Sequence, residues 1–304
     1  MFMEKNEPLV SIIMNCYNCE SYLNESIESV LNQTYKNFEI IFWDNNSTDN
    51  SSVIYNEYKN NDNRLKYFYS KTHTMLGEAR NLAIEKASGE WIAFLDCDDI
   101  WLPEKLEKQI NLYYEINNSD VNLIYGQSLI FNDSTLLSNS KGVQKLNKYR
   151  NKFLLKKLPE GKIFNKLLFI NFIPLVTAIV KKSSIEKVGK INVKYNILED
   201  YELFLKITLI GDALAIHHAI SLYRIHATNT TILKKNQKFV ELFETIEFYK
   251  DATIFQEALK FHKAVQSISL FREKKVIKAL ILFTKESSLN SIFKLLKLKY
   301  MKKI

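Results

Sequence analysis

Trp91 to Pro103 read Trp-Ile-Ala-Phe-Leu-Asp-Cys-Asp-Asp-Ile-Trp-Leu-Pro, an apolar run that leads directly into three closely spaced carboxylates. A buried strand that ends in clustered acids places negative charge at the edge of a sheet, which is where open α/β folds bind ligands. Asp96, Asp98 and Asp99 repel one another, so the cluster is costly unless a cation or strong hydrogen-bond donors share the site. A hard divalent cation with oxygen ligands, bridging to a diphosphate, accounts for these residues most simply.

The same residues also fit a solvated acidic turn before a helix. In that interpretation Asp99 is the N-cap and Pro103 lies in the first helical turn. The spacing Asp-x-Asp alone does not separate the two interpretations, so the rest of the chain must decide between them.

Strand and helix patterns alternate before this stretch. Strands are predicted at 10–14, 38–43, 65–69 and 91–95. Helices are predicted at 20–34, from the polar turn 44–49 to residue 58, and at 77–87. Three βα alternations before the acidic cluster indicate an α/β fold with a mostly parallel, doubly wound sheet. Later segments predict a strand at 122–131, loop at 133–160, β-like chain at 174–181, a helix at 199–210, two short strands at 213–226, and helices from 236 onward.

Composition and charge are those of a soluble globular protein with a basic tail. Of the 304 residues, 46% are hydrophobic and 25% are charged. Residues 271–304 hold ten Lys or Arg and two Asp or Glu, so they carry the whole net charge of +8. The N-terminus has no apolar targeting segment, and the apolar stretch 167–180 is interrupted by Asn171 and Pro174. We expect a cytoplasmic protein that does not bind nucleic acid.

The chain has three cysteines, Cys16, Cys19 and Cys97. Cys16 and Cys19 have the Cys-x-x-Cys spacing of redox motifs, but no second pair exists to complete a zinc site. We expect three free thiols in a reducing compartment.

Other polar residues follow predicted strands or begin predicted helices. Asp44 ends the second strand, so in a parallel sheet it shares an edge with the acidic cluster and can read a nucleobase or ribose. Arg80 lies in the first turn of the 77–87 helix and can bind a phosphate or ribose, or else pair with Glu78 or Glu85. These positions favour a nucleotide site at this edge.

The second half of the chain contains candidates for a general base and for a metal ligand. Asp200, or its neighbour Glu199, begins the 199–210 helix and is either an acid that matches the helix dipole or a base that faces the cleft. His226 follows a strand and is either a structural residue or, with two carboxylates, a ligand of a divalent ion such as manganese.

Taken together, these motifs resemble the family-2 glycosyltransferases. The similar segments, in chain order, are Val-Ser-Ile-Ile-Met-Asn-Cys-Tyr-Asn at 10–18, Ser-Val-Leu-Asn-Gln-Thr-Tyr at 29–35, Phe-Glu-Ile-Ile at 38–41, Asp-Asn-Asn-Ser-Thr-Asp at 44–49, Ala-Arg-Asn at 79–81, Gly-Glu-Trp-Ile-Ala-Phe-Leu-Asp at 89–96, Val-Gly at 188–189, Glu-Asp-Tyr at 199–201 and Tyr-Arg-Ile-His at 223–226. Two departures concern the nucleotide side, since Asn15-Cys16 replaces the usual Pro-Thr and Asn45 replaces a second Asp.

The resemblance implies a glycosyltransferase A-type fold and inverting transfer of a sugar from a nucleotide donor, with UDP expected, to a glycan or lipid-linked acceptor. Residues 1–115 would form the donor-binding half, 116–230 the acceptor-binding half, and 231–304 a helical, basic extension.

The resemblance also assigns roles to single residues. Asp200 would be the base. The donor-binding set is Asn15, Tyr17, Asp44, Arg80, Asp96 and Cys97, and the ligands of Mn²⁺ or Mg²⁺ are Asp98, Asp96 and His226.

Three other protein classes are compared with this sequence, and the basic tail is considered as a membrane-binding surface. A phosphatase of the haloacid dehalogenase type would carry its acids on the first strand, and a nicotinamide dehydrogenase would need Gly-x-Gly-x-x-Gly there, so neither fits. A non-catalytic protein that binds nucleotide sugars remains open. The apolar and basic residues of 271–304 predict a helix that binds an anionic membrane surface, at the inner face of the membrane, or packs on the catalytic body.

Overall fold

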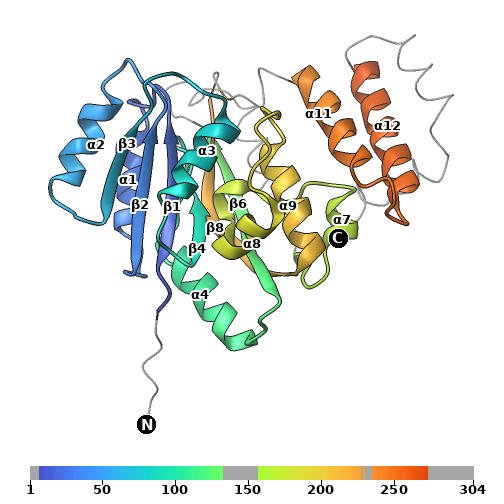
Figure 1. Ribbon diagram of the computed structural model, residues 1–304, viewed down its shortest axis with the longest axis horizontal. Coiled ribbons are helices and arrows are strands. Elements are labelled where there is room, and N and C mark those ends of the chain that lie inside the picture. The colour runs from blue at the N-terminus through green and yellow to red at the C-terminus, as the bar shows by residue number, and fades with distance from the viewer. Residues whose placement is uncertain (1–6, 133–156, 227–228, 230–234, 273–304) are drawn as a thin grey trace. The chain divides into compact units, whose positions relative to one another are not determined.

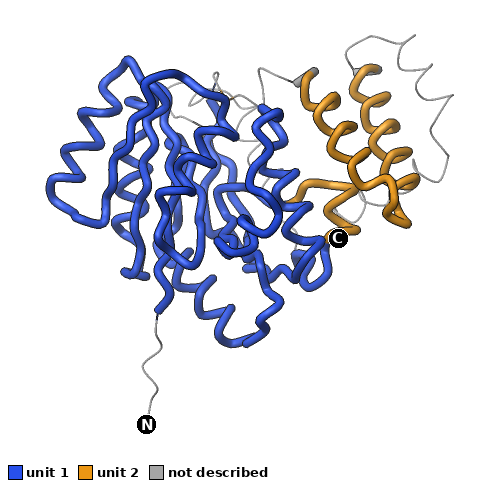
Figure 2. Tube along the Cα trace, in the orientation of Figure 1, with its two compact units in different colours: residues 1–163, 173–227 blue, residues 164–172, 228–304 orange. Residues whose placement is uncertain are grey.

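The computed structural model describes residues 7–132, 157–226, 229 and 235–272. Its contacts divide the chain into two compact units, residues 1–163 with 173–227, and residues 164–172 with 228–304 (Figure 2). The first unit contains the sheet and every site residue that the sequence predicts.

The first unit is built on an eight-stranded mixed sheet of order β3-β2-β1-β4-β7-β6-β8-β5 (Figure 1). The strands are β1 Val10–Cys16, β2 Phe38–Asp44, β3 Leu65–Tyr69, β4 Trp91–Phe94, β5 Ile100–Trp101, β6 Val121–Asn132, β7 Ile179–Lys181 and β8 Asp212–Ile225. The pairs β1–β2, β2–β3, β1–β4 and β6–β8 are parallel, and those of β7 with β4 and β6, and of β5 with β8, are antiparallel. The predicted α/β class is confirmed.

Helices cover both faces of this sheet. In the described part of this unit the α-helices are α1 Leu23–Leu31, α2 Ser51–Lys59, α3 Leu76–Glu85, α4 Lys105–Ile116, α8 Lys182–Val188 and α9 Glu199–Ile210, and η1 Leu175–Thr177 is a 3-10 helix. Apolar residues of α1, α2 and α4 form one buried cluster with alternate residues of β1, because successive strand side chains point to opposite faces. Helices α3, α8 and α9 lie on the other face (Figure 1).

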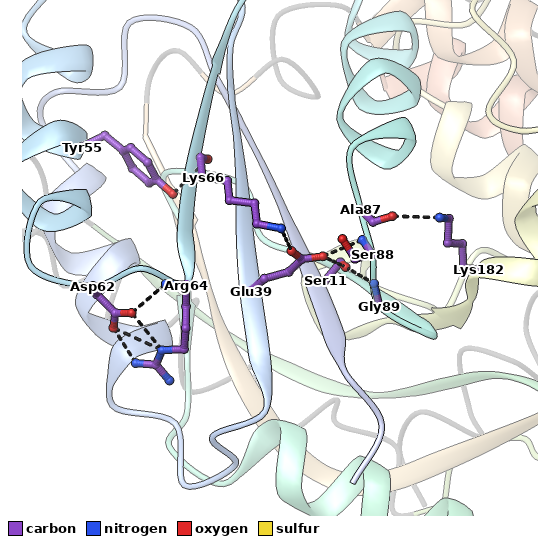
Figure 3. Close-up of polar contacts among 10 residues, drawn as sticks. All are labelled: Ser11, Glu39, Tyr55, Asp62, Arg64, Lys66, Ala87, Ser88, Gly89 and Lys182. Atoms are coloured by element: carbon purple, nitrogen blue, oxygen red, sulfur yellow. Dashed lines mark hydrogen bonds and ion pairs between the residues drawn. The ribbon is translucent and has the colours of Figure 1, made fainter. Parts of the chain in front are cut away.

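A polar network at the amino ends of the strands fixes the start of β4 (Figure 3). The buried Glu39 carboxylate accepts hydrogen bonds from Ser11 Oγ at 2.5 Å and from the Ser88 N–H at 2.6 Å, and it pairs with Lys66 at 2.5 Å. The Gly89 N–H donates to Ser11 Oγ at 2.7 Å. A Cβ on Gly89 would lie 2.6 Å from Ser11 N, so only glycine lets the chain approach β1 this closely.

The second unit is helical in its described part. It contains α7 Phe164–Leu167, α11 Lys235–Glu247 and α12 Phe255–Arg272. His262 Nε2 lies 2.8 Å from the Leu168 carbonyl oxygen, which joins α12 to the segment after α7. None of the helices that the structure describes combines the length and the hydropathy of a membrane-spanning helix.

Two predictions about local structure are wrong. Where two short strands are predicted within 213–226, the structure has one strand, β8 Asp212–Ile225, because shifts in its register with β6 accommodate the irregular pattern. Asp99 is not an N-cap, since the short strand β5 follows it and α4 begins only at Lys105. Residues 133–156 and 273–304 lie outside the described residues, so the loop and most of the basic tail remain predictions.

Candidate active site

The carboxyl ends of three parallel strands meet at one edge of the sheet. Cys16 of β1 pairs with Asp44 of β2, and the Leu95 N–H after β4 donates to the Ile13 carbonyl oxygen at 3.1 Å. The chain therefore brings the polar residues that follow β1, β2 and β4 to the same edge, as the sequence predicts.

Arg80 connects this edge to the start of α9. Its guanidinium donates to Asp96 Oδ1 at 2.8 Å and forms a second ion pair with Glu199. Arg80 is only 3% exposed, and burial alone would lower its pKa, but the attraction of Asp96 and Glu199 outweighs burial and raises the pKa. Glu85 instead pairs with Lys190, so Arg80 positions two acids of the site.

The end of β8 holds the Asp98 segment. His226 Nε2 lies 2.8 Å from Asp98 Oδ2, and Arg224 Nε donates to the Asp98 carbonyl oxygen at 2.8 Å. Arg224 also pairs with Glu25 of α1 at 2.7 Å and lies over the Tyr22 ring. These contacts fix both the backbone and the carboxylate of Asp98, whose side chain is 27% exposed.

Asp99 is the buried member of the acidic cluster. Its Oδ1 accepts a hydrogen bond from the Arg224 N–H at 2.9 Å. Burial raises the pKa of Asp99 well above its usual value, and the charges of Asp98 and Asp96 raise it further. Burial and the neighbouring carboxylates therefore disfavour the charged form of Asp99.

Asp200 is the second residue of α9 and lies beside the Arg80 ion pairs. Burial raises its pKa to about 7, with the charge of Glu199 adding and that of Arg80 opposing. Its Oδ1 accepts a hydrogen bond from the Tyr201 N–H at 2.6 Å. A carboxyl group that titrates near neutral pH is suited to accept a proton from a hydroxyl group, and Glu199 is already engaged by Arg80.

The predicted nucleotide-side residues differ in how they are held. Asp44 is buried, and its two oxygens accept hydrogen bonds from the Ser47 N–H and the Tyr67 hydroxyl, both at 2.8 Å. Tyr17 is half exposed, with its ring centroid 4.2 Å from that of His73. These contacts fix the turn after β2 and leave an aromatic pair exposed near it.

Asn15 and Cys97 lie between β1 and the acidic cluster. The Asn15 amide oxygen and nitrogen are both buried and have no hydrogen-bond partner within the described part of the chain. Cys97 Sγ donates to the Asn15 carbonyl oxygen at 3.4 Å, so its thiol packs against β1. All three cysteines are free, as predicted.

Several residues that shape the site are absent from the sequence-based predictions. Arg224, Glu25 and Tyr22 fix the Asp98 segment, and His73 packs on Tyr17. Arg224 had a signal, because it stands in the same Tyr-Arg-Ile-His motif as His226. The others lie in helices and loops with no distinctive spacing.

A mixed α/β sheet with clustered acids at the ends of its parallel strands is the arrangement expected of a glycosyltransferase A-type fold. The chain matches the family "Glycosyl transferase family 2" over residues 11–171, more than half of its length. It therefore belongs to this family, and the predicted family resemblance and glycosyltransferase activity are confirmed.

Individual relatives agree with this assignment. The chain is 37% identical over 204 residues to an uncharacterized glycosyltransferase of Haemophilus influenzae, covering 66% of this chain and 72% of that protein. It is 40% identical over 138 residues to the Escherichia coli UDP-Glc:alpha-D-GlcNAc-diphosphoundecaprenol beta-1,3-glucosyltransferase WfgD, covering 45% of this chain and 53% of that protein.

Solved structures share the fold. The S. aureus TarS fragment 1-349 in complex with UDP aligns with a TM-score of 0.61 at 20% identity, covering 83% of this chain and 71% of that one. The mannosyltransferase PcManGT from Pyrobaculum calidifontis, in complex with GDP-Man and Mn²⁺, aligns with a TM-score of 0.65 at 15% identity, covering 96% and 80%.

Proposed function

We propose that this enzyme transfers a sugar from UDP to a hydroxyl group of a cell-envelope glycan or a lipid-linked saccharide, with inversion at the anomeric carbon. The observation that carries the proposal is that Arg80 pairs with Asp96 and with Glu199, so the first turn of α9, where Asp200 follows Glu199, lies beside a donor-side acid. Burial raises the pKa of Asp200 to about 7, which suits a general base.

The chemistry requires one carboxylate base. An acceptor hydroxyl loses its proton to Asp200 as its oxygen attacks the anomeric carbon, while the bond to the nucleoside diphosphate breaks. The sugar passes through an oxocarbenium-like transition state, as in glycoside hydrolysis. A single displacement from the opposite face inverts the anomeric centre, and no covalent sugar–enzyme bond is needed.

The residues around Asp98 fit a divalent cation. Asp98 and Asp96 offer partly exposed carboxylates, and His226 adds an imidazole nitrogen, a donor set that suits Mn²⁺ or Mg²⁺. When bound, the cation supplies charge neutralisation for the departing diphosphate. Arg224 supports this role because its contacts with the Asp98 carbonyl oxygen and Glu25 keep the Asp98 segment in place.

The donor side favours a nucleotide at the edge formed by β1 and β2. The exposed Tyr17–His73 ring pair offers a face for a nucleobase, and the unpartnered Asn15 amide offers a donor and an acceptor. UDP is preferred because the TarS complex contains UDP and the E. coli relative is named for a UDP-glucose donor.

The acceptor proposal rests on that relative and on the basic tail. The E. coli protein is named for a diphosphoundecaprenol-linked acceptor. Residues 271–304, which carry the net charge of +8, would bring the enzyme to an anionic membrane surface where such acceptors lie.

The test is donor turnover by the full-length protein. UDP-sugars that raise the melting temperature in the presence of Mn²⁺ are selected first, because a ligand of the native state stabilises it. Asp200→Asn should keep donor binding and lower turnover by about two to four orders of magnitude. Glu202→Gln, the same change two residues on in α9, where Glu202 pairs with Lys206, is the matched control.

Two results would contradict the proposal. Turnover that survives Asp200→Asn but not Glu199→Gln would move the base to Glu199. Donor binding with no turnover on any hydroxyl acceptor, or on water, would favour a non-catalytic protein that binds nucleotide sugars.

A further inference from the structure

All three cysteines of the chain meet at one point beside the active site. Cys16 ends β1, Cys19 lies in the loop after it, and Cys97 lies between Asp96 and Asp98. Their three Sγ atoms all lie within 4.8 Å of one another. Cys97 is 81 residues from Cys16 in the sequence, so the fold supplies the third thiol that the Cys-x-x-Cys spacing alone lacks.

The separation of the sulfurs suits a shared metal ion. A zinc–sulfur bond of about 2.3 Å with tetrahedral angles places two thiolates roughly 3.8 Å apart. The cluster needs to contract by about 1 Å or less to reach that distance, which side-chain torsions can supply. Thiolate sulfur selects thiophilic ions such as Zn²⁺ and Cd²⁺ over Mn²⁺ and Mg²⁺.

The surroundings provide polar neighbours and access. Ser47 Oγ lies 3.7 Å from Cys16 Sγ, and the Cys19 N–H donates to Ser51 Oγ at 2.9 Å. Ser51 is the first residue of α2, whose N-terminal end carries partial positive charge and favours a negative cluster. Cys16 and Cys97 are buried, while Cys19 is half-buried and gives an ion a path from solvent.

We propose that Cys16, Cys19 and Cys97 bind one thiophilic divalent cation. The three thiols release their protons to solvent as the sulfurs coordinate the ion, so binding is stronger at higher pH. This site goes beyond the proposed sugar transfer and uses none of the oxygen or imidazole ligands around Asp98. Because Cys97 stands between Asp96 and Asp98, a bound ion would fix the backbone that carries both acids.

The experiment is a titration of the full-length, reduced protein with Cd²⁺ alone, followed by its thiolate-to-metal charge-transfer absorption in the ultraviolet. We expect saturation at one ion per chain and protection of all three thiols from alkylation. Loss of a residue that only hydrogen-bonds to a metal ligand typically weakens metal binding by roughly 10–100-fold. Cys19→Ser removes a ligand itself, so it should weaken Cd²⁺ binding by more than that. Asp98→Asn should leave the absorption unchanged, because its carboxylate belongs to the other site.

A second variant and a second readout keep the test decisive. Cys97→Ala should abolish the absorption, and near-ultraviolet circular dichroism of both cysteine variants checks that the native packing is kept. The proposal is overturned if Cd²⁺ gives no saturable absorption, if Cys19→Ser leaves it unchanged, or if Asp98→Asn removes it. It is also overturned if mass spectrometry finds a Cys16–Cys19 disulfide and no metal in protein that has been offered Zn²⁺.

Discussion

Replacing Arg80 by methionine tests the central ion-pair arrangement of the site. The change keeps most of the side-chain volume but removes the guanidinium that is shared by Asp96 and Glu199. The two carboxylates differ in exposure, because the Asp96 side chain is 39% exposed and that of Glu199 only 4%. Water can therefore solvate Asp96 after the change, whereas Glu199 keeps a buried charge without this cation.

The expected loss of unfolding free energy follows from that difference. An exposed ion pair contributes about 0–1 kcal/mol, so the Asp96 contact accounts for little. Removing one partner of a buried pair costs about 3–5 kcal/mol, and we expect Arg80→Met to lie in this range because of Glu199. The double variant Arg80→Met/Glu199→Gln removes the buried charge as well and should recover at least about half of the loss.

Urea denaturation followed by circular dichroism measures these free energies. A matched control is Arg64→Met, because Arg64 pairs with Asp62 at a partly exposed position away from the site. The reasoning is refuted if Arg80→Met costs no more than Arg64→Met, or if adding Glu199→Gln makes the protein less stable still.

Four further outcomes are expected. Asp98→Asn should remove most of the gain in UDP affinity that Mn²⁺ gives over a chelator, measured by calorimetry; equal affinity with and without metal in the unaltered protein would exclude this role. Turnover should fall as pH is lowered through about 7, because a protonated Asp200 cannot accept a proton, and a pH–rate profile that stays flat there would count against it. Gly89→Ala should lower the free energy of unfolding by about 1–3 kcal/mol, since its Cβ would lie 2.6 Å from the Leu9 carbonyl oxygen; an unchanged urea midpoint would show that the backbone can move apart. Full-length protein should sediment with anionic liposomes at low salt, and truncation after about residue 270 should abolish this; protein that stays in the supernatant would favour a tail that packs on the body.

The first half of the fold could be predicted because its signals are local. Strand β3 has the predicted bounds Leu65–Tyr69, and every residue of β2 is buried, as the apolar run from Ile40 to Trp43 indicates for a strand in the middle of a parallel sheet. Helix α9 also has its predicted bounds, Glu199–Ile210. In the second half, the sequence of strand β8 is partly polar, and the strand changes register along β6. Its length is therefore set by pairing with β6, which the hydrophobic pattern of β8 does not reveal.

The partners within the site were harder to predict than its members. The pattern placed Arg80 near a phosphate or beside Glu78 or Glu85, which are neighbours along its own helix. Its partner Glu199 lies 119 residues away, and nothing in the local sequence marks that contact. The sequence likewise does not predict that Cys97 converges on Cys16 and Cys19, because the spacing rules for zinc sites join two pairs of ligands and Cys97 is a single cysteine.

The long contacts of the acidic cluster also set the order in which the protein can form. Arg224 lies 125 residues beyond Asp99 and 199 residues beyond Glu25, and His226 lies 128 residues beyond Asp98. During synthesis Asp98 and Asp99 therefore emerge long before Arg224 and His226, which contact them, and closing loops of this length is slow. A nascent chain that already has β1 to β4 carries mutually repelling carboxylates, and it acquires a working centre only when β8 has been made and added to the sheet.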